Sequence, residues 1–367
     1  MVKRKILLLA IVILWCSQSV FAEETQRYTQ ELSEYLHIDA VVQDPGVDEL
    51  PILSCAYIDY AEYDFADFSF FPEGLSADMI EEHRVDEGTE WEHTVCTAKQ
   101  NAYLEELRYT SDGYFNFSTP MGHLVFSAIL YATHDAEIPF NQDLHFMTCE
   151  AAENAAKEFL ATLGMSQSAV NGIQTISKDV YDALYEFGRE WHEADLSEGL
   201  TKLGATEWYD WPTQDVCYVL NCSPAYQGVP FVAQNALQTS SSSSMENLMD
   251  AQGYWPSIEL YWFAEGVEYL DIANAVCYQA VGEAAKILSF EEAVERFVNG
   301  GPRLLSLQQQ TVTEIGLYYI IRPEAEGYIA RPYWVFVAER EQREPLHAVK
   351  SYLFLDAHSG EWSGEWR

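Results

Sequence analysis

A histidine among carboxylates is the first group of residues in this sequence that could support chemistry. The stretch EWHEAD places His192 beside Glu193 and three residues before Asp195. On a helix, residues three apart share a face, so His192 and Asp195 could hold one metal ion. No second histidine follows at the HExxH spacing, and among 58 acidic residues a carboxylate near any histidine is expected by chance. Two other pairs are no more specific: Glu82–His83 and Glu92–His93. We therefore assign no metal ligand.

A nucleophilic cysteine and a pair of carboxylates are the other catalytic arrangements that the composition allows. Cys149 lies at the start of a predicted helix, where a distant histidine could activate it, although packing explains a cysteine there equally well. Glycoside hydrolysis requires two carboxyl groups at a defined separation, and acidic residues this numerous select no pair. The sequence contains no GxSxG motif. We assign no catalytic residue and no cofactor, and the absence of such motifs favours a protein that is not an enzyme.

Aromatic pairs and a C-terminal acidic turn could instead bind ligands. Three pairs could stack on sugars or grip a peptide: Tyr254–Trp255, Tyr261–Trp262 and Tyr333–Trp334. Because neighbours on a strand point to opposite faces, one member of each pair would face a core, which favours packing. The carboxylates from Asp356 to Glu361 could hold calcium, but the spacing lacks the alternation of a calcium loop. A turn that depends on Asp356 and Gly360 is the favoured interpretation.

The overall composition limits the classes of partner. The chain has 367 residues, of which 48% are hydrophobic and 14% aromatic, which indicates a folded protein of two or three domains. Its formal net charge is −38, so its surface repels phosphate backbones and anionic lipids. We therefore expect no nucleic-acid partner. Cations or basic peptides are the ligands that such a surface attracts.

The N-terminus predicts export. Basic residues at positions 3–5 precede an apolar run from Ile6 to Trp15, and small residues lie three and one positions before a cleavage site after Ala22. We predict a signal peptide over residues 1–22 and a secreted or cell-surface protein. Lipid anchoring at Cys16 is the alternative, although the bulky Trp15 stands where a lipobox has a small residue. No later segment is long and apolar enough to span a membrane.

Six cysteines remain after residue 22, and they permit either disulfides or thiols. An even number in an exported protein allows up to three disulfides, with fifteen complete pairings. The spacings match no zinc motif, and buried thiols are equally compatible. Apolar neighbours favour the thiol for Cys149 and Cys277. The complete set is Cys55, Cys96, Cys149, Cys217, Cys222 and Cys277.

Local patterns predict the elements that would position these residues. Alternating apolar residues predict a strand over 36–45, and Asp112-Gly113 predicts a hairpin turn. Thr148 caps a predicted helix that stops at Gly164. A capping box of Ser289 and Glu292 starts another helix, which ends at Gly300-Gly301-Pro302. The remaining predictions are a linker or first helix over 23–34, a helix over 177–194, hairpins near Gln227-Gly228 and Glu265-Gly266, and three strands after position 310.

These elements divide the mature chain into three regions. They are an N-terminal α+β region over 23–140, a middle helical and strand region over 141–238, and a C-terminal α+β domain over 239–367. The flexible stretch TSSSSS lies near the start of the last region.

The last 150 residues carry an ordered series of short motifs. The series is GVP (228–230), GVEYLDI (266–272), ILSFEEAVERF (287–297), IGLYYI (315–320), RPYWVF (331–336) and FLDAHSGEW (354–362). It resembles the extracytoplasmic domains of YycH/YycI-type regulatory proteins and their PepSY-like relatives. With IDAVVQDP (38–45) and AAKEFLATLGM (155–165), the chain is also similar to an uncharacterised family of exported lipoproteins from Gram-positive gut bacteria.

The resemblance implies a fold and a class of function but names no catalytic residue. It implies an α+β architecture of antiparallel sheets, each packed by a helix on one face, in two or three PepSY/YycI-like subdomains. Regulators of the YycI type act through a transmembrane helix, which a cleaved chain would lack. We expect a non-enzymatic extracytoplasmic binding or regulatory protein whose partner is an envelope protein or peptide. The alternative is a cell-surface carbohydrate-binding or glycan-active protein.

Overall fold

The computed structural model is mostly β-sheet, with few helices. It describes residues 26–63, 80–86, 92–99, 106–119, 138–184, 186, 215–232, 255–300, 310–324, 327–340 and 349–362, and six positions between 121 and 129. The named strands form two sheets. Ala22, Cys16 and residues 192–195 lie outside this description, so the predictions made for them stay predictions.

One sheet has nine described strands in the order β10-β9-β11-β12-β7-β6-β5-β4, and β8 also pairs with β9. Its strands are β4 (Ile80–Asp86), β5 (Glu92–Lys99), β6 (Glu106–Thr110), β7 (Phe115–Ser118), β8 (Ser168–Ile176), β9 (Cys217–Tyr226), β10 (Val229–Pro230), β11 (Ser257–Phe263) and β12 (Gly266–Ala273). The predicted turns lie where expected: Gly113 and Gly228 have φ of +83° and +81°, conformations that glycine adopts without steric cost.

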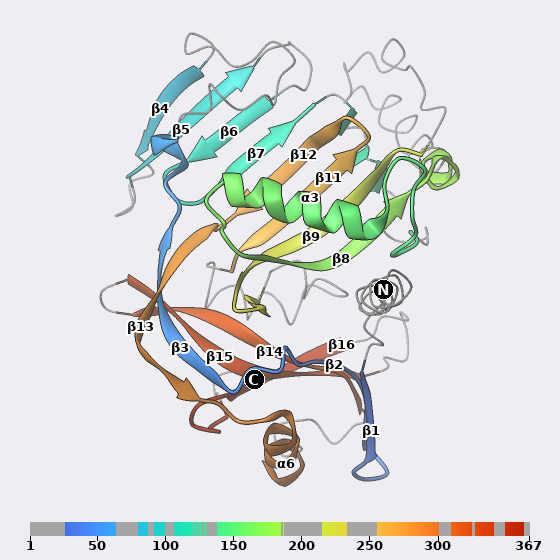
Figure 1. Cartoon of the computed structure of the whole chain (residues 1–367), viewed down its shortest axis with the longest axis vertical. Helices are drawn as coiled ribbons and strands as arrows, with labels where there is room; N and C mark the ends of the chain where they lie inside the picture. The colour runs from blue at the N-terminus through green and yellow to red at the C-terminus, as the bar shows by residue number, and fades with distance from the viewer. Residues whose placement is uncertain are drawn as a thin grey trace, which may run out of the picture. The chain divides into compact units, whose positions relative to one another are not determined.

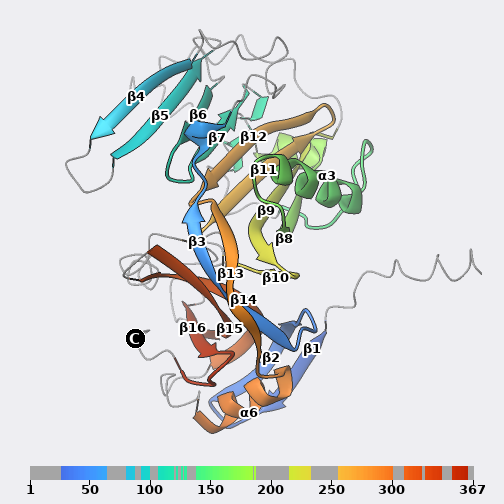
Figure 2. The same ribbon diagram turned by 60° about the vertical axis from the view of Figure 1, so that its left-hand side comes forward.

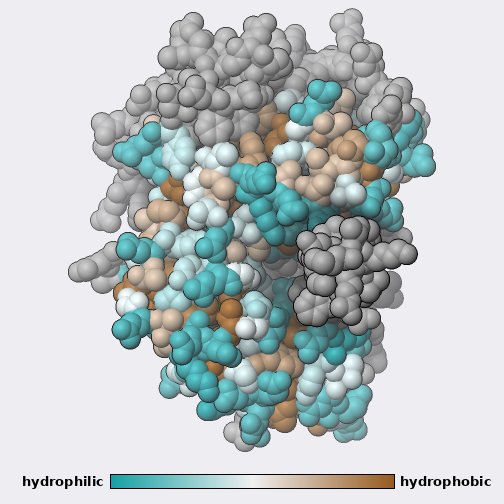
Figure 3. All heavy atoms as spheres, in the orientation of Figure 1, coloured by the Kyte–Doolittle hydropathy of each residue, from teal (hydrophilic) through white to brown (hydrophobic). Residues whose placement is uncertain are grey.

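Helix α3 (Cys149–Thr162) lies across β8, β9 and β11 of this sheet (Figure 1). The Thr148 hydroxyl accepts the N–H of Ala151 at 3.2 Å, which confirms the predicted N-cap. Ala152, Ala156 and Leu160 are fully buried at helical spacing and pack with strand residues. The exposed side of α3 carries Glu150, Asn154 and Glu158 together with two alanines, and Figure 3 shows teal hydrophilic atoms beside paler ones in this region. Amphipathicity therefore sets which way the helix faces.

The other sheet has seven described strands in the order β1-β2-β14-β15-β3-β13, and β16 also pairs with β15. Its strands are β1 (Arg27–Glu31), β2 (Leu36–Gln43), β3 (Glu49–Tyr57), β13 (Val276–Lys286), β14 (Gln310–Glu324), β15 (Gly327–Arg340) and β16 (Val349–Asp356). Strand β2 and the three C-terminal strands confirm predictions, whereas 27–31 form a strand and not the predicted linker or helix.

The pairing of β2 with β14 is parallel, which corrects the prediction of antiparallel sheets. Leu36 lies opposite Gln310 and Val42 opposite Ile315, and the hydroxyl of Thr311 is 2.8 Å from Nε2 of His37. Parallel partners require a long connection, and here 274 positions separate His37 from Thr311. Local sequence patterns contain no information about such a pairing.

Helix α6 (Phe290–Gly300) begins at the predicted capping box. The Ser289 N–H donates to the Glu292 carboxylate at 2.9 Å, and the Glu292 N–H donates to the Ser289 hydroxyl at 3.2 Å. The ring of Phe297 is fully buried and stacks on Phe336 of β15, with centroids 4.6 Å apart. Trp362 packs edge-on against Phe297 at 6.2 Å. Three aromatic rings thus join α6, β15 and the C-terminal turn.

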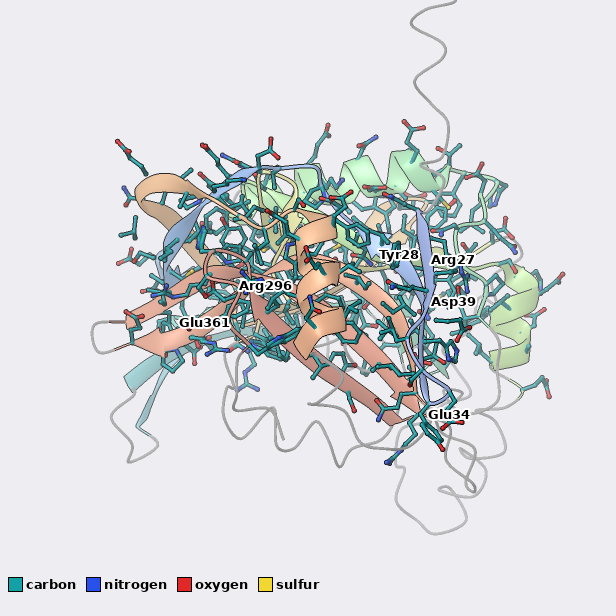
Figure 4. All side chains as sticks on the ribbon, turned by 90° about the horizontal axis from the view of Figure 1, so that it is seen from below. Arg27, Tyr28, Glu34, Asp39, Arg296 and Glu361 are labelled. Atoms are coloured by element: carbon teal, nitrogen blue, oxygen red, sulfur yellow. The ribbon has the colours of Figure 1, made fainter. Side chains whose placement is uncertain are left out.

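That turn has the form that the sequence predicts. Oδ1 of Asp356 accepts the N–H groups of His358 at 3.0 Å and Ser359 at 2.8 Å. Gly360 has φ +70°, and a Cβ there would lie 3.4 Å from Cζ of Arg296. Figure 4 labels Arg296 on α6 and Glu361 after the turn. The Asp356 carboxylate thus accepts backbone amides of the turn, as the predicted turn requires.

The chain forms two compact units that are not consecutive in sequence. One contains the described residues of 26–47, 288–317 and 334–362, and the other those of 48–287 and 318–333. Strands β14 and β15 run from one unit into the other. In the first unit, Arg27 of β1 forms a 2.6 Å ion pair with Asp39 of β2, as Figure 4 shows.

Candidate functional site

Strand β13 presents an edge along which no other described strand pairs. It stands at the end of its sheet order beside β3 (Figure 2), and β3 is its one strand partner in the described part of the chain; the Tyr278 hydroxyl also donates to the Ala225 carbonyl of β9. Every residue from Gln279 to Lys286 is exposed, and the Val281 side chain is 53% exposed. An unpaired strand edge is a template on which another extended segment can add as a strand. We therefore take β13 as the candidate functional site.

The ladder between β3 and β13 identifies which backbone groups face outward. The Ile58 N–H donates to the Ala275 carbonyl at 2.9 Å, and Val276 is paired with Tyr57. In an antiparallel ladder alternate residues direct both backbone groups toward the partner strand. Residues 277, 279 and 281 therefore face β3. Tyr278 and Ala280 direct their N–H and carbonyl groups to the open side, whereas Val276, which has the same orientation, is buried.

A bulge limits the straight part of this edge. Val276 to Val281 pair one-to-one with β3, and the register then shifts between Val281 and Ala285. Gly282 lies inside the shift with φ +76°. Since bulges bend a strand and interrupt its pairing, the regular part of the edge is six residues long, with the sequence VCYQAV.

Two other edges of the described sheets are protected, in contrast to β13. Along β8, the N–H of Thr175 donates to Pro139 at 2.8 Å, and the N–H of Asn141 donates to Ile173 at 3.0 Å. Strand β1 is only five residues long and carries the Arg27–Asp39 ion pair. Short length, charge and covering loops are the usual protections of sheet edges. On β13 the bulge and the charged Glu283 and Lys286 lie beyond Val281 and leave the stretch from Tyr278 to Val281 without charge.

A row of polar side chains crosses the nine-stranded sheet on the face opposite α3. The cross-strand pairing places these residues in one line: Asn221, Glu259, Asp271, Asn116 and Arg108. Their neighbours along each strand, such as Leu260 and Leu270, belong to the hydrophobic core under α3, so the alternation of side chains puts the row on the other face.

Two carboxylates lie directly opposite each other in this row. Glu259 and Asp271 are cross-strand partners and both are half-buried. Burial raises the pKa of Glu259 and the nearby Asp271 charge adds to the rise, while the 2.7 Å hydrogen bond from the Tyr261 hydroxyl opposes it. Burial also raises the pKa of Asp271, which accepts the Asn116 amide at 3.0 Å. Burial and the facing charge thus both disfavour the ionised forms of this pair.

Cys149 does not have the environment of an activated nucleophile. Its Sγ donates to the carbonyl of Gln142 at 3.3 Å, and burial raises the pKa of the thiol. His145 is directed instead to Asp215, with Nδ1 3.1 Å from Oδ2. In the described part of the chain, no hydrogen bond joins Cys149 to a histidine. A nucleophilic cysteine requires the thiolate, and these contacts favour the thiol.

The other predicted candidates are spread over the fold. Tyr261, Tyr333, Trp255 and Trp334 are buried, and Trp262 packs edge-on against Phe159 of α3, so these aromatic residues pack; Tyr254 lies outside the described residues. Glu82–His83 lies on β4 and Glu92–His93 on β5. Among the residues that the structure describes, no group of three potential ligands could hold a metal.

The cysteines that the structure describes are thiols. Cys217 and Cys222 are buried, and burial raises the pKa of Cys222 to about 12. Cys55 is buried and Cys149 is half-buried. Cys277 on β13 is exposed, although its neighbours in the sequence are apolar. The pairing of Cys96 stays untested. No described helix is long and apolar enough to cross a membrane.

Sequence patterns missed β13 entirely. Its exposed residues show no alternation of apolar and polar types, and Ala284, Ala285 and Gly282 have low strand propensity. The only available signal was the uncharged run VCYQAV before a glycine. The Glu259–Asp271 pair was equally hidden, because only the register of two strands selects it among 58 acidic residues.

Comparison with known proteins adds information about the fold. No protein-family model matches the chain, and no curated protein does. A crystal structure of an uncharacterized protein from Eubacterium rectale ATCC 33656 matches with TM-score 0.58 and 17% identity, over 92% of this chain and 93% of that one. The Bacillus megaterium YpeB C-terminal domain also aligns, over 80% of this chain and 90% of that one, but with 12% identity and TM-score 0.28 it carries no argument. The chain thus shares the fold of an uncharacterized protein, at an identity that shows fold alone.

Proposed function

We propose that this chain is an exported, non-enzymatic binding or regulatory protein that captures an extended protein segment by strand addition at β13. The observation that carries the proposal is the outward direction of the backbone groups of Tyr278 and Ala280. Export rests on the predicted signal peptide over residues 1–22, with lipid anchoring at Cys16 as the alternative. The likeness to the Eubacterium rectale protein concerns the fold alone and adds no support.

The energetics of the edge suit a reversible interaction. Tyr278 and Ala280 offer four outward backbone groups, and each net hydrogen bond contributes about 0.5–1.5 kcal/mol. Ordering each residue of a flexible segment costs about 1–2 kcal/mol, so the backbone alone gives weak binding. Affinity must therefore also come from side chains that pack on exposed residues such as Val281.

The finer architecture belongs to the same proposal. Helices α3 and α6 each contact strands through buried side chains, which supports an arrangement in which each sheet carries a helix on one face. We propose that this arrangement repeats as two or three PepSY/YycI-like subdomains. The region boundaries after positions 140 and 238 stay predictions. An envelope protein or peptide is the partner class that the proposal implies.

The test uses one position on the edge with two substitutions. A displayed library of random peptides is selected on the immobilised full chain, and the selected peptides are measured against the Ala280→Pro and Ala280→Thr variants. Proline removes one outward N–H and leaves the β3 ladder intact, so binding should weaken about tenfold, whereas threonine keeps the N–H and should preserve binding. Circular dichroism and melting establish that both variants fold.

Three outcomes of this test would contradict strand addition at β13. A selection that yields no peptide contradicts the proposed function, as do peptides that bind the proline variant as tightly as the wild type. Equal losses in both variants would indicate a side-chain effect at position 280 and would also contradict strand addition.

A second candidate function is favoured by the Glu259–Asp271 pair. Two carboxyl groups that face each other, both with a pKa raised by burial, are the residue types that glycoside hydrolysis uses. Hydrolysis or binding of wall or dietary glycans that Asp271→Asn abolishes would support it. An absence of hydrolysis and of binding on a glycan array would reject it.

A further inference from the structure

We infer that the segment added at β13 has an uncharged core and basic residues at both ends. This inference rests on the proposed strand addition and specifies the chemistry of the partner. It follows from how charge is distributed along β13 and the strand that supports it.

Acidic side chains lie on and beside the two-stranded segment of β3 and β13, which is called the ribbon below. Residues 48–63 and 276–287 contain five acidic residues and one basic residue, Lys286. The acidic residues are Asp48, Glu49, Asp59, Glu62 and Glu283. All of them are exposed except Asp59, which is half-buried. The ribbon thus carries an excess of negative charge in addition to the net charge of −38 of the whole chain.

The acidic residues lie at the two ends of the straight edge. Asp59 and Glu62 follow β3 beside the start of β13, where Ile58 donates to Ala275. Glu283 lies just past Val281, and the Ile287 N–H donates to the Asp48 carbonyl at 3.0 Å near the far end. Lysine or arginine before and after the core of an added strand would therefore meet carboxylates at both ends.

The core of the edge itself is uncharged. From Val276 to Val281 the sequence VCYQAV has no ionisable residue except the thiol and the phenol. Cross-strand pairs favour aromatic and β-branched side chains opposite such residues, and a buried unpaired charge there would be costly. Six residues of an added strand span about 20 Å, which the bulge after Val281 terminates.

A second copy of this chain fits the edge less well than a basic partner. Two chains that each carry a net charge of −38 repel one another, and the excess of carboxylates on the ribbon would be brought together. Charge complementarity therefore identifies a cationic segment of another protein or peptide as the partner of this edge.

The test starts from the peptides selected on the full chain and changes only their ends. For one selected sequence, the flanking lysines and arginines are replaced by glutamine and then by glutamate, and the core is kept. Affinity for the wild-type chain should fall about tenfold with glutamate flanks and should decrease with rising salt. A peptide with N-methyl groups on alternate core amides serves as the control for strand addition.

Each outcome decides between the two proposals. If selected peptides lack basic flanks, or if flank charge leaves affinity unchanged while N-methylation abolishes it, the charge inference is wrong and strand addition stands. If N-methylation changes nothing, strand addition itself is wrong. If sedimentation shows a wild-type dimer that the Ala280→Pro variant loses, a second copy occupies the edge and the inference is overturned.

Discussion

Replacing Glu259 by glutamine should stabilise this protein near neutral pH. The wild-type carboxyl is half-buried opposite Asp271, and among the described residues no basic side chain forms an ion pair with either group. Glutamine keeps an oxygen that can accept the Tyr261 hydroxyl, now 2.7 Å from Oε1, and it removes the charge. The substitution therefore removes a like-charge contact and a desolvated carboxylate at nearly constant shape.

The sign of the pH dependence follows from the raised pKa of Glu259 in the folded state. A carboxyl whose folded pKa exceeds its unfolded pKa contributes stability that is fully present below the unfolded pKa and is lost as pH rises through the folded pKa. Relief of like charges directly opposite on two strands is worth roughly 0.2–1 kcal/mol. Glu259→Gln should thus raise the melting temperature by about 2 °C near pH 7, and this gain should vanish in acid.

Thermal melting at a series of pH values measures this effect, with Glu158→Gln on the exposed face of α3 as the matched control. The control should change the melting temperature little at any pH. A Glu259→Gln variant that is less stable than the wild type at neutral pH would refute the reasoning. It would mean that the ionised carboxylate has favourable partners that outweigh its burial and the Asp271 charge.

Two further predictions concern the C-terminal part of the chain. Phe297→Ala removes a fully buried ring stacked on Phe336 and should cost about 3–5 kcal/mol of unfolding free energy, whereas Phe297→Leu should cost clearly less; equal losses in denaturant titrations would contradict the packing argument. Asp356→Ala removes the acceptor for the Ser359 N–H and should cost about 1–2 kcal/mol, while deletion of 363–367 should leave the melting temperature nearly unchanged, and the reverse order would contradict the turn.

Local chemistry made parts of the fold predictable from sequence. The Thr148 cap, the Ser289–Glu292 capping box and the Asp356 turn each involve residues at most a few positions apart, so their side chains identify them directly. Gly113 was identifiable because its turn requires a positive φ. These features stop or start an element, and they contain no information about which strands become neighbours.

The candidate site depends on the information that local patterns lack. Whether β13 is an edge is decided by the order of strands in its sheet, and β3, its only described partner, is more than 200 positions away in the sequence. The facing of Glu259 and Asp271 depends on the register between β11 and β12. The composition shows that the protein is acidic and could bind cations. Only the fold shows which acidic residues lie close together.

The parallel pairing of β2 with β14 has a consequence for how the chain folds. At a synthesis rate of about 5–20 residues per second, the 274 positions between His37 and Thr311 correspond to roughly 15 to 55 s. Throughout that interval the apolar side chains of Leu36, Ile38 and Val42 exist without the strand that later pairs with β2. High contact order of this kind slows folding and leaves a β-prone segment exposed to aggregation. A factor that shields this segment until β14 is available would therefore raise the yield of folded protein.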